Sequence, residues 1–258
     1  MNTIQQLINL EWLKADSTVN RRFFVISLAV YALNSSIRLF ILTIDDSPTT
    51  DTVLNALVES HFRNCVLLVP LWVIFNVSYE YEHRIIVRHV AEGMKPVYYF
   101  ISKFFLLIFI GIFHILLSIL ITLLATISLK IAPPLLLPLF LVELHTFVLS
   151  VVLGVFALCI SFQFKHSREA ITFYLLYMVC EYSLVALYYR YSGTSFPFPL
   201  PFQSIRALTY ETVGANQVSR FWQADRTFLL ALSGYIVTFL LLTYRRLTQL
   251  DLLPSRHS

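Results

Sequence analysis

The stretch Tyr79–Phe105, YEYEHRIIVRHVAEGMKPVYYFISKFF, decides how the rest of the chain is interpreted, because it is a charged segment between two long apolar runs. It carries four positive side chains, those of Arg84, Arg88, Lys95 and Lys103. Connections rich in Lys and Arg favour the cytoplasmic side of a membrane. We therefore expect this polar segment to face the cytoplasm.

The whole chain has the composition of a protein that lies mostly in lipid. Of its 258 residues, 57% are hydrophobic and 13% are charged, whereas soluble domains carry about 25% charged residues. The net charge of +4 suits loops near anionic lipid, so we expect membrane lipid and no nucleic acid as a partner. The N-terminal sequence has no pattern of a cleavable signal peptide, and we expect the first span to be retained.

The three cysteines, Cys65, Cys159 and Cys180, lie in apolar runs without C-x-x-C spacing. Buried cysteines commonly behave as small hydrophobic residues, and we predict that role for all three. The cysteines therefore indicate no disulfide framework and no metal site.

The apolar runs predict an all-α integral membrane protein with one transmembrane domain over residues 1–258. A spanning helix needs about 20 apolar residues, which gives six transmembrane helices at about 23–44, 61–78, 100–129, 135–162, 170–190 and 227–244. Residues 4–20 carry apolar side chains at helical spacing among polar ones, and predict an amphipathic elbow helix in the membrane interface. Arg38 is expected to reach the outer interface, and a buried functional ion pair is the alternative.

The connection between spans 5 and 6 is long and contains Pro197, Pro199 and Pro201 between aromatic and aliphatic residues. We predict a re-entrant outer segment, because irregular backbone at membrane depth is tolerated where protein covers it. Most Lys and Arg residues then fall in the inner segments, which places both termini in the cytoplasm.

The polar segment itself predicts two helices with a break between them. Glu80 and Arg84, and likewise Arg84 and Arg88, have the i, i+4 spacing of neighbours on a helix. Gly93 is typical of a helix end and Pro96 of a first helical turn. We expect a short helix across the membrane plane and then the entry to span 3, and an ordinary solvated loop is the alternative.

This layout resembles the permease (transmembrane) subunit of type-2 (ABC-2 family) ATP-binding cassette transporters. Within the polar segment the resemblance rests on Glu80 or Glu82, Arg84, Arg88, Gly93, the aromatic pair at Tyr98–Tyr99 or Phe100, and Lys103. Many members have Gly-Thr after the glutamate and Ser-Arg after the later glycine. This chain has His83-Arg84-Ile85 and Met94-Lys95-Pro96 at those places.

The resemblance implies an exporter of the cell (inner) membrane in which two permease subunits, alike or different, form the pathway. Separate cytoplasmic ATP-binding cassette ATPase subunits would dock on the coupling helix between spans 2 and 3. ATP-Mg would be bound by that partner, because this chain has no G-x-x-x-x-G-K-[ST] loop, and neither enzyme activity nor a cofactor is expected in the chain itself. The contacts implied for the ATPase involve Glu82, Arg84, Arg88, His89, Glu92 and Gly93.

Ionisable residues inside the predicted spans are functional hypotheses by default. Glu181, in the middle of span 5, has either a substrate-path role or a structural hydrogen-bond role. Glu143 and His145 are further speculative substrate-path residues, although positions two apart point in different directions on a helix. An integral-membrane enzyme using these residues and His114 stays open, as does a membrane scaffold that recruits a cytoplasmic partner. No catalytic or metal-binding motif is found, and the sequence does not identify a substrate.

Overall fold

The computed structural model describes residues 18–44, 50–83, 85, 95–128, 136–164, 166–193, 200–201 and 226–250. These residues form six helices and no strand, which confirms the all-α fold class. The helices are α2 (Thr18–Ile44), α3 (Thr50–Glu82), α5 (Pro96–Ser128), α6 (Leu136–Gln163), α7 (Ser167–Ser192) and α9 (Arg226–Leu250). Most of the predicted elbow helix, the coupling helix and the re-entrant segment lies outside the described residues.

Each helix coincides with one predicted span, but not every helix has the composition of a span over its described residues. By length and composition, three segments are long and apolar enough to cross a membrane: Arg63–Glu82, Val97–Ala125 and Ser167–Ser192. Ser150–Gln163 in α6 is a shorter apolar stretch. Helices of this length and composition are typical of a membrane protein.

Helix α3 begins earlier than the sequence predicts. The apolar run predicts a span at 61–78, whereas α3 already starts at Thr50 and continues to Glu82. The additional residues 50–60 mix polar and apolar side chains, so a search for continuous apolar runs does not detect them. They extend α3 to 33 residues, or about 50 Å at 1.5 Å per residue.

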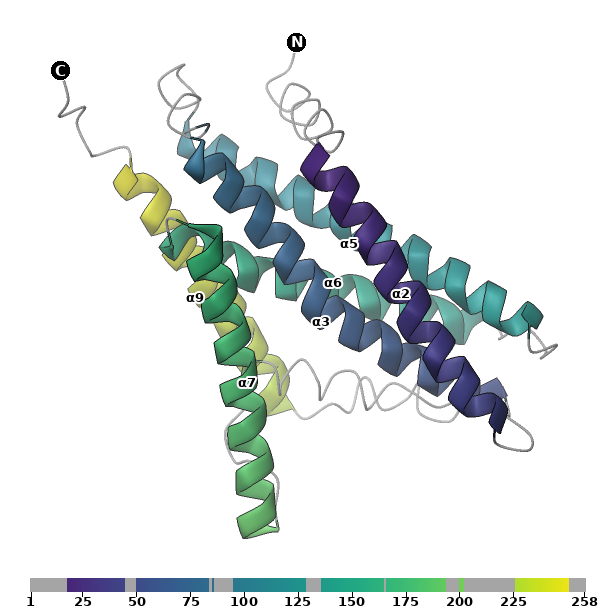
Figure 1. Cartoon of the computed structure of the whole chain (residues 1–258). Helices are drawn as coiled ribbons and strands as arrows, with labels where there is room; N and C mark the ends of the chain where they lie inside the picture. Colours follow the sequence, from purple (N-terminus) through teal and green to yellow (C-terminus); the bar gives the residue numbers. More distant parts are fainter. Residues whose placement is uncertain are drawn as a thin grey trace.

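The helices run alternately in opposite directions (Figure 1), and α3 and α6 share the most contacts with the other helices. Helix α3 packs against α2, α5, α6 and α7, while α6 also packs against α5, α7 and α9. The start of α2, the end of α3, the start of α7 and the end of α9 lie at one end of the bundle. We refer to it as the Glu82 end.

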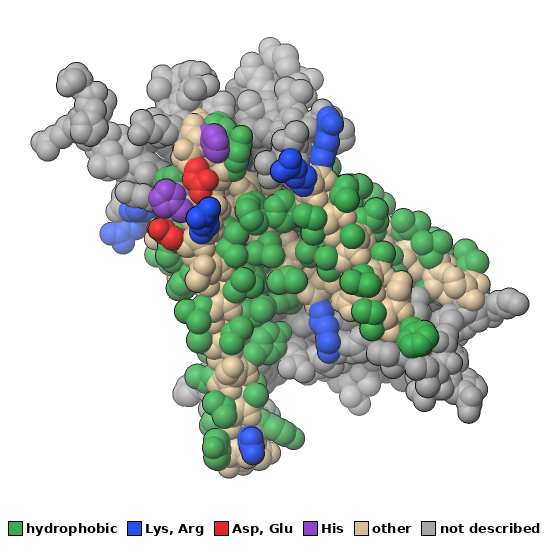
Figure 2. All heavy atoms as spheres, in the orientation of Figure 1, with side chains coloured by type: hydrophobic (Ala, Val, Ile, Leu, Met, Phe, Trp, Pro, Cys, Tyr) green, Lys and Arg blue, Asp and Glu red, His purple; other side chains and the backbone are tan. Residues whose placement is uncertain are grey.

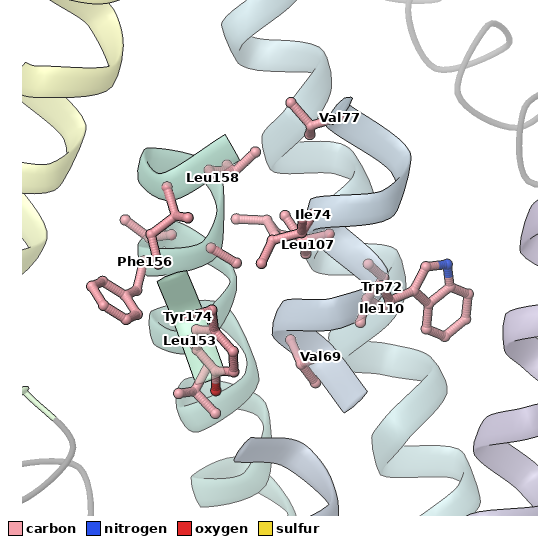
Figure 3. Close-up of a cluster of buried hydrophobic side chains, with 14 of the residues drawn as sticks. Val69, Trp72, Ile74, Val77, Leu107, Ile110, Leu153, Phe156, Leu158 and Tyr174 are labelled. Carbon is pink, nitrogen blue, oxygen red and sulfur yellow. The ribbon is translucent and has the colours of Figure 1, made fainter. Parts of the chain in front are cut away.

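The core is formed mainly by α3, α5 and α6, with Tyr174 reaching in from α7 (Figure 3). Buried side chains such as Trp72, Leu107 and Leu153 fill it. Glycines bring α5 and α6 close together, since a Cβ at Gly111 would lie 2.9 Å from a ring carbon of Phe147. Close approach of this kind drives helix association in lipid, where apolar burial alone does not.

Helix α7 is attached to α3 through a proline. Pro70 lies inside α3 and has no backbone N–H, so the carbonyl of Val66, four residues earlier, loses its usual helical partner. The hydroxyl of Tyr174 donates a hydrogen bond to that carbonyl. The Tyr174 side chain from α7 therefore supplies the hydrogen-bond donor that Pro70 removes from α3.

Outside this attachment, α7 is the least covered of the three candidate spans. Only 17% of its most apolar window is buried, against 67% in α3 and 44% in α5. Cys180 is exposed on α7, whereas Cys65 and Cys159 are buried. The prediction that all three cysteines are buried is therefore wrong for Cys180, because an apolar neighbourhood in the sequence also describes a lipid-facing surface.

Candidate functional site

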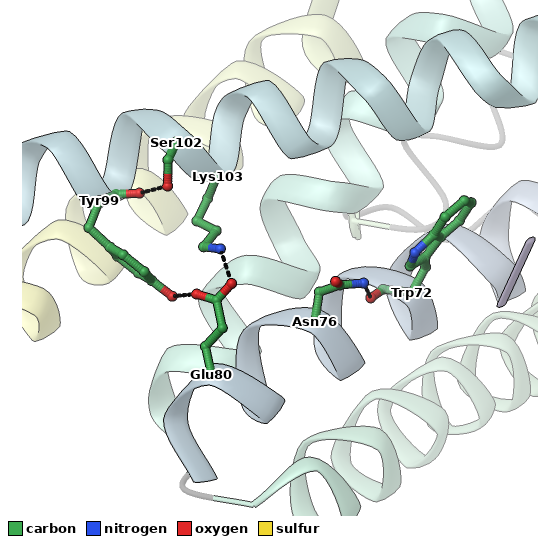
Figure 4. Close-up of polar contacts among 6 residues, drawn as sticks. All are labelled: Trp72, Asn76, Glu80, Tyr99, Ser102 and Lys103. Atoms are coloured by element: carbon green, nitrogen blue, oxygen red, sulfur yellow. Dashed lines mark hydrogen bonds and ion pairs between the residues drawn. The ribbon is translucent and has the colours of Figure 1, made fainter. Parts of the chain in front are cut away.

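The last turn of α3 contains a buried carboxylate, that of Glu80 (Figure 4). Its Oε1 accepts a hydrogen bond from Lys103 Nζ at 2.7 Å, and its Oε2 accepts one from the Tyr99 hydroxyl at 2.6 Å. Lys103 Nζ also lies 4.9 Å from the centre of the Tyr99 ring, within range of a cation–π contact. Glu80, Tyr99 and Lys103 thus form a clamp between α3 and α5.

The clamp differs from what the sequence predicts for two of these residues. Glu80 was expected to pair with Arg84 along one helix, and Lys103 was counted with the exposed positive charges of the inner side. The structure instead buries both side chains and pairs them across two helices. They are 23 residues apart, so the i, i+4 spacing of a single helix could not predict their contact. The available signal is that two opposite charges each lie next to an apolar run, where charged side chains commonly pair.

Glu82, the final residue of α3, contacts the first turn of α7. Its Oε1 accepts hydrogen bonds from the backbone N–H of Ser167 at 2.8 Å and from the Ser167 hydroxyl at 3.0 Å. Backbone N–H groups at a helix start have no partner within the helix, and the helix dipole favours a negative charge there. Glu82 was predicted to contact an ATPase; the structure gives it a partner within the chain.

The final residues of α3 are thus held from two sides. Glu80 ties the helix to α5 and Glu82 ties it to α7, while the ring of His83 stacks on Tyr79 at 4.0 Å between ring centres. The segment 84–95 connects this anchored turn to Pro96, the first residue of α5. Of the other predicted contact residues, Arg84, Arg88, His89, Glu92 and Gly93 lie outside the described residues.

The exposed charged side chains gather near the same place. On the face drawn in Figure 2, most of the coloured charged and histidine side chains lie towards one end, and hydrophobic side chains cover most of the remainder. The exposed members at the Glu82 end include Arg21, Arg22, Lys95, Arg168 and Arg245. Such a distribution suits a helical bundle whose sides face lipid and whose end faces water.

Of the three predicted substrate-path side chains, the structure describes one. Glu143 and His145 belong to α6, but their side chains lie outside the described part of the chain. Glu181 is described and is buried on α7. Of the three, the structure thus places only the Glu181 side chain, and it buries that side chain in the protein.

A buried polar cluster that the sequence reasoning missed surrounds Tyr31 of α2. The Tyr31 ring lies 5.7 Å from that of His61 and 5.5 Å from that of His114, and its hydroxyl is 3.3 Å from Cys65 Sγ. His114 Nδ1 lies 2.8 Å from the carbonyl oxygen of Ile110, so this nitrogen carries the proton. Among the described residues, no group of three or more His, Cys, Asp and Glu side chains could hold a metal ion.

No protein-family model and no curated protein matches this chain. The resemblance to ABC-2 permeases therefore rests on the layout of the sequence. What the site can do must be argued from its own contacts. Those contacts make the Glu82 end a junction at which α3, α5 and α7 are joined immediately beside the charged segment.

Proposed function

We propose that this chain is the membrane-spanning permease subunit of an ATP-binding cassette exporter. In this role it couples ATP hydrolysis by a separate ATPase subunit to the movement of a substrate across the membrane. The observation that carries the proposal is the anchoring of the charged segment. The segment 84–95 begins one turn after the Glu80–Lys103 pair and directly after the Glu82–Ser167 contact.

A coupling element has to transmit force, and the contacts at the Glu82 end suit that task. A push on a loosely attached loop would be absorbed by the loop. A push on the segment 84–95 acts on α3 at its last turn, where buried hydrogen bonds to α5 and a capping contact to α7 pass the movement on. Packed cores and fixed interfaces switch as units rather than deform continuously.

The proposal includes six membrane spans, an elbow helix and a re-entrant outer segment. It places the protein in the cell (inner) membrane with both chain ends in the cytoplasm. Six helices with alternating directions support it, as do the positions of the first residue of α2 and the last residue of α9 at the Glu82 end. A second permease subunit, identical or different, would complete the pathway. ATP-Mg would be bound by the ATPase partner.

The decisive experiment asks whether an ATP-binding cassette ATPase encoded by a neighbouring gene binds this chain. We expect the two proteins to purify together, and the permease in lipid to raise ATPase turnover. Replacing Arg84→Glu together with Arg88→Glu should lower the affinity about tenfold or more, because charge reversal at an interface places like charges together. The matched control is Arg190→Glu, which changes an exposed arginine at the opposite end of α7. Equal binding and turnover for all three proteins would contradict the proposal.

A further inference from the structure

Glu181 is a buried carboxylate on α7. It follows Ser167, the first residue of α7, by about 14 residues, or about 21 Å at the helical rise of 1.5 Å per residue. That distance puts Glu181 close to the middle of a membrane-spanning helix, and its side chain is buried. Carboxylates at this depth are expensive, and they commonly mark a substrate or ion pathway.

Aromatic side chains from three helices form a row of ring contacts, and two tyrosines of this row interact with the carboxylate. Phe156 of α6 lies 5.4 Å from Tyr177 of α7 and 4.9 Å from Phe239 of α9, measured between ring centres. Phe239 in turn stacks on Tyr235 at 6.1 Å. The two ends of this row return to Glu181: the Tyr177 hydroxyl is hydrogen-bonded to the carboxylate, and Tyr235 interacts with it electrostatically. We refer to these four rings together with Glu181 as the belt.

The chemistry of the belt favours one class of ligand. The faces of aromatic rings attract cations within about 6 Å, and quaternary ammonium groups are recognised in this way. A carboxylate adds a full negative charge, which acts strongly where water is excluded. Small metal ions need several oxygen ligands in place of their water, which rings do not supply, whereas a bulky organic cation has little bound water to lose.

The belt also lies where such a ligand could arrive. Tyr177, Tyr235 and Phe239 are only half-buried, so part of each ring is available to a bound molecule. Helix α7 is mostly uncovered along its length, and a cation dissolved in the bilayer would meet the belt at the side of the bundle formed by α7 and α9.

We propose that Glu181, Tyr177, Tyr235, Phe156 and Phe239 form a binding site for lipophilic monovalent organic cations, such as quaternary ammonium or phosphonium compounds. The inference deepens the proposed function by naming a substrate class. It rests on that function for transport, but binding itself needs no ATPase.

The test measures equilibrium binding of radiolabelled tetraphenylphosphonium to the purified full chain in nanodiscs of uncharged lipid. We expect saturable binding that the neutral isostere tetraphenylmethane does not displace. Glu181→Gln keeps the side-chain shape and an acceptor for Tyr177 but removes the charge, and should weaken binding about tenfold or more. Glu169→Gln, which alters an exposed carboxylate on the same helix, should leave binding unchanged.

A structural role for Glu181 predicts a different pattern. If the carboxylate only supports the fold, Glu181→Gln will lower thermal stability without changing the affinity of the folded fraction, and that result would overturn the proposal, as would the absence of saturable binding. Phe239→Leu is a second test variant that leaves the carboxylate in place. It should weaken cation binding about threefold, because one ring face is lost. Because no ATPase is present, failure of cation binding and failure of ATPase docking are separate outcomes.

Discussion

Lys103 and Glu80 form a buried ion pair, with Nζ 2.7 Å from Oε1, that joins α5 to the last turn of α3. The Tyr99 hydroxyl donates a hydrogen bond to the second carboxylate oxygen of Glu80, so both oxygens have a partner that stabilises the negative charge. The pair holds together the two helices from which the charged segment leaves and to which it returns. It is therefore the contact on which a force-transmitting role for that segment depends.

Removing one partner of this pair should be costly. Lys103→Met removes the positive charge that pairs with the buried Glu80 carboxylate, and we expect a loss of about 3 to 5 kcal/mol of stability. Thermal unfolding in detergent, followed by circular dichroism, measures it. Lys103→Met combined with Glu80→Leu should recover most of the loss, since an apolar pair of similar volume replaces the ions. If the losses instead add up in the double variant, the pair is not coupled as described.

The contact between Glu82 and Ser167 should stabilise the start of α7 locally. Glu82→Ala removes the acceptor of two hydrogen bonds, and loss of a cap of this kind costs about 0.5 to 2 kcal/mol. Hydrogen exchange should become faster by about two- to thirtyfold in the first turn of α7, while α5 stays unchanged. Glu169→Asp, an exposed change in the same turn that keeps the negative charge there, is the control. Unchanged exchange at Ser167–Ala170 would show that the cap is not formed.

The positions of the six helices followed from the apolar runs, because a helix in lipid must be apolar over most of its length. The predicted spans 100–129 and 135–162 agree with α5 and α6 to within a few residues. The contacts between helices did not follow in the same way. Glu80 and Lys103 carry opposite charges, but nothing in their separation of 23 residues indicates that they meet. Burial was also ambiguous, since Cys180 lies in an apolar run and is nevertheless exposed.

Close packing between α5 and α6 predicts that two glycines respond oppositely to substitution. Any Cβ at Gly154 meets the buried side chain of Leu107, whereas a Cβ at Gly234 of α9 has open space around it. Gly154→Ala should cost about 1 to 3 kcal/mol through overpacking. Gly234→Ala should raise stability by about 0.5 to 1 kcal/mol, because alanine favours a helix over glycine. Thermal unfolding of both variants in detergent tests this, and equal effects would contradict the packing.

The hydrogen bond from Tyr174 to the Val66 carbonyl predicts that substitutions at Tyr174 and Pro70 have non-additive effects on stability. Tyr174→Phe leaves the carbonyl without a donor, and an unsatisfied buried group costs about 1 to 3 kcal/mol. Pro70→Ala restores a backbone N–H, which can bond to the same carbonyl within α3. In the Pro70→Ala background, Tyr174→Phe should therefore cost much less. Unfolding of the two single variants and the double variant completes the cycle. Equal losses in both backgrounds would show that Tyr174 does not substitute for the missing N–H of Pro70.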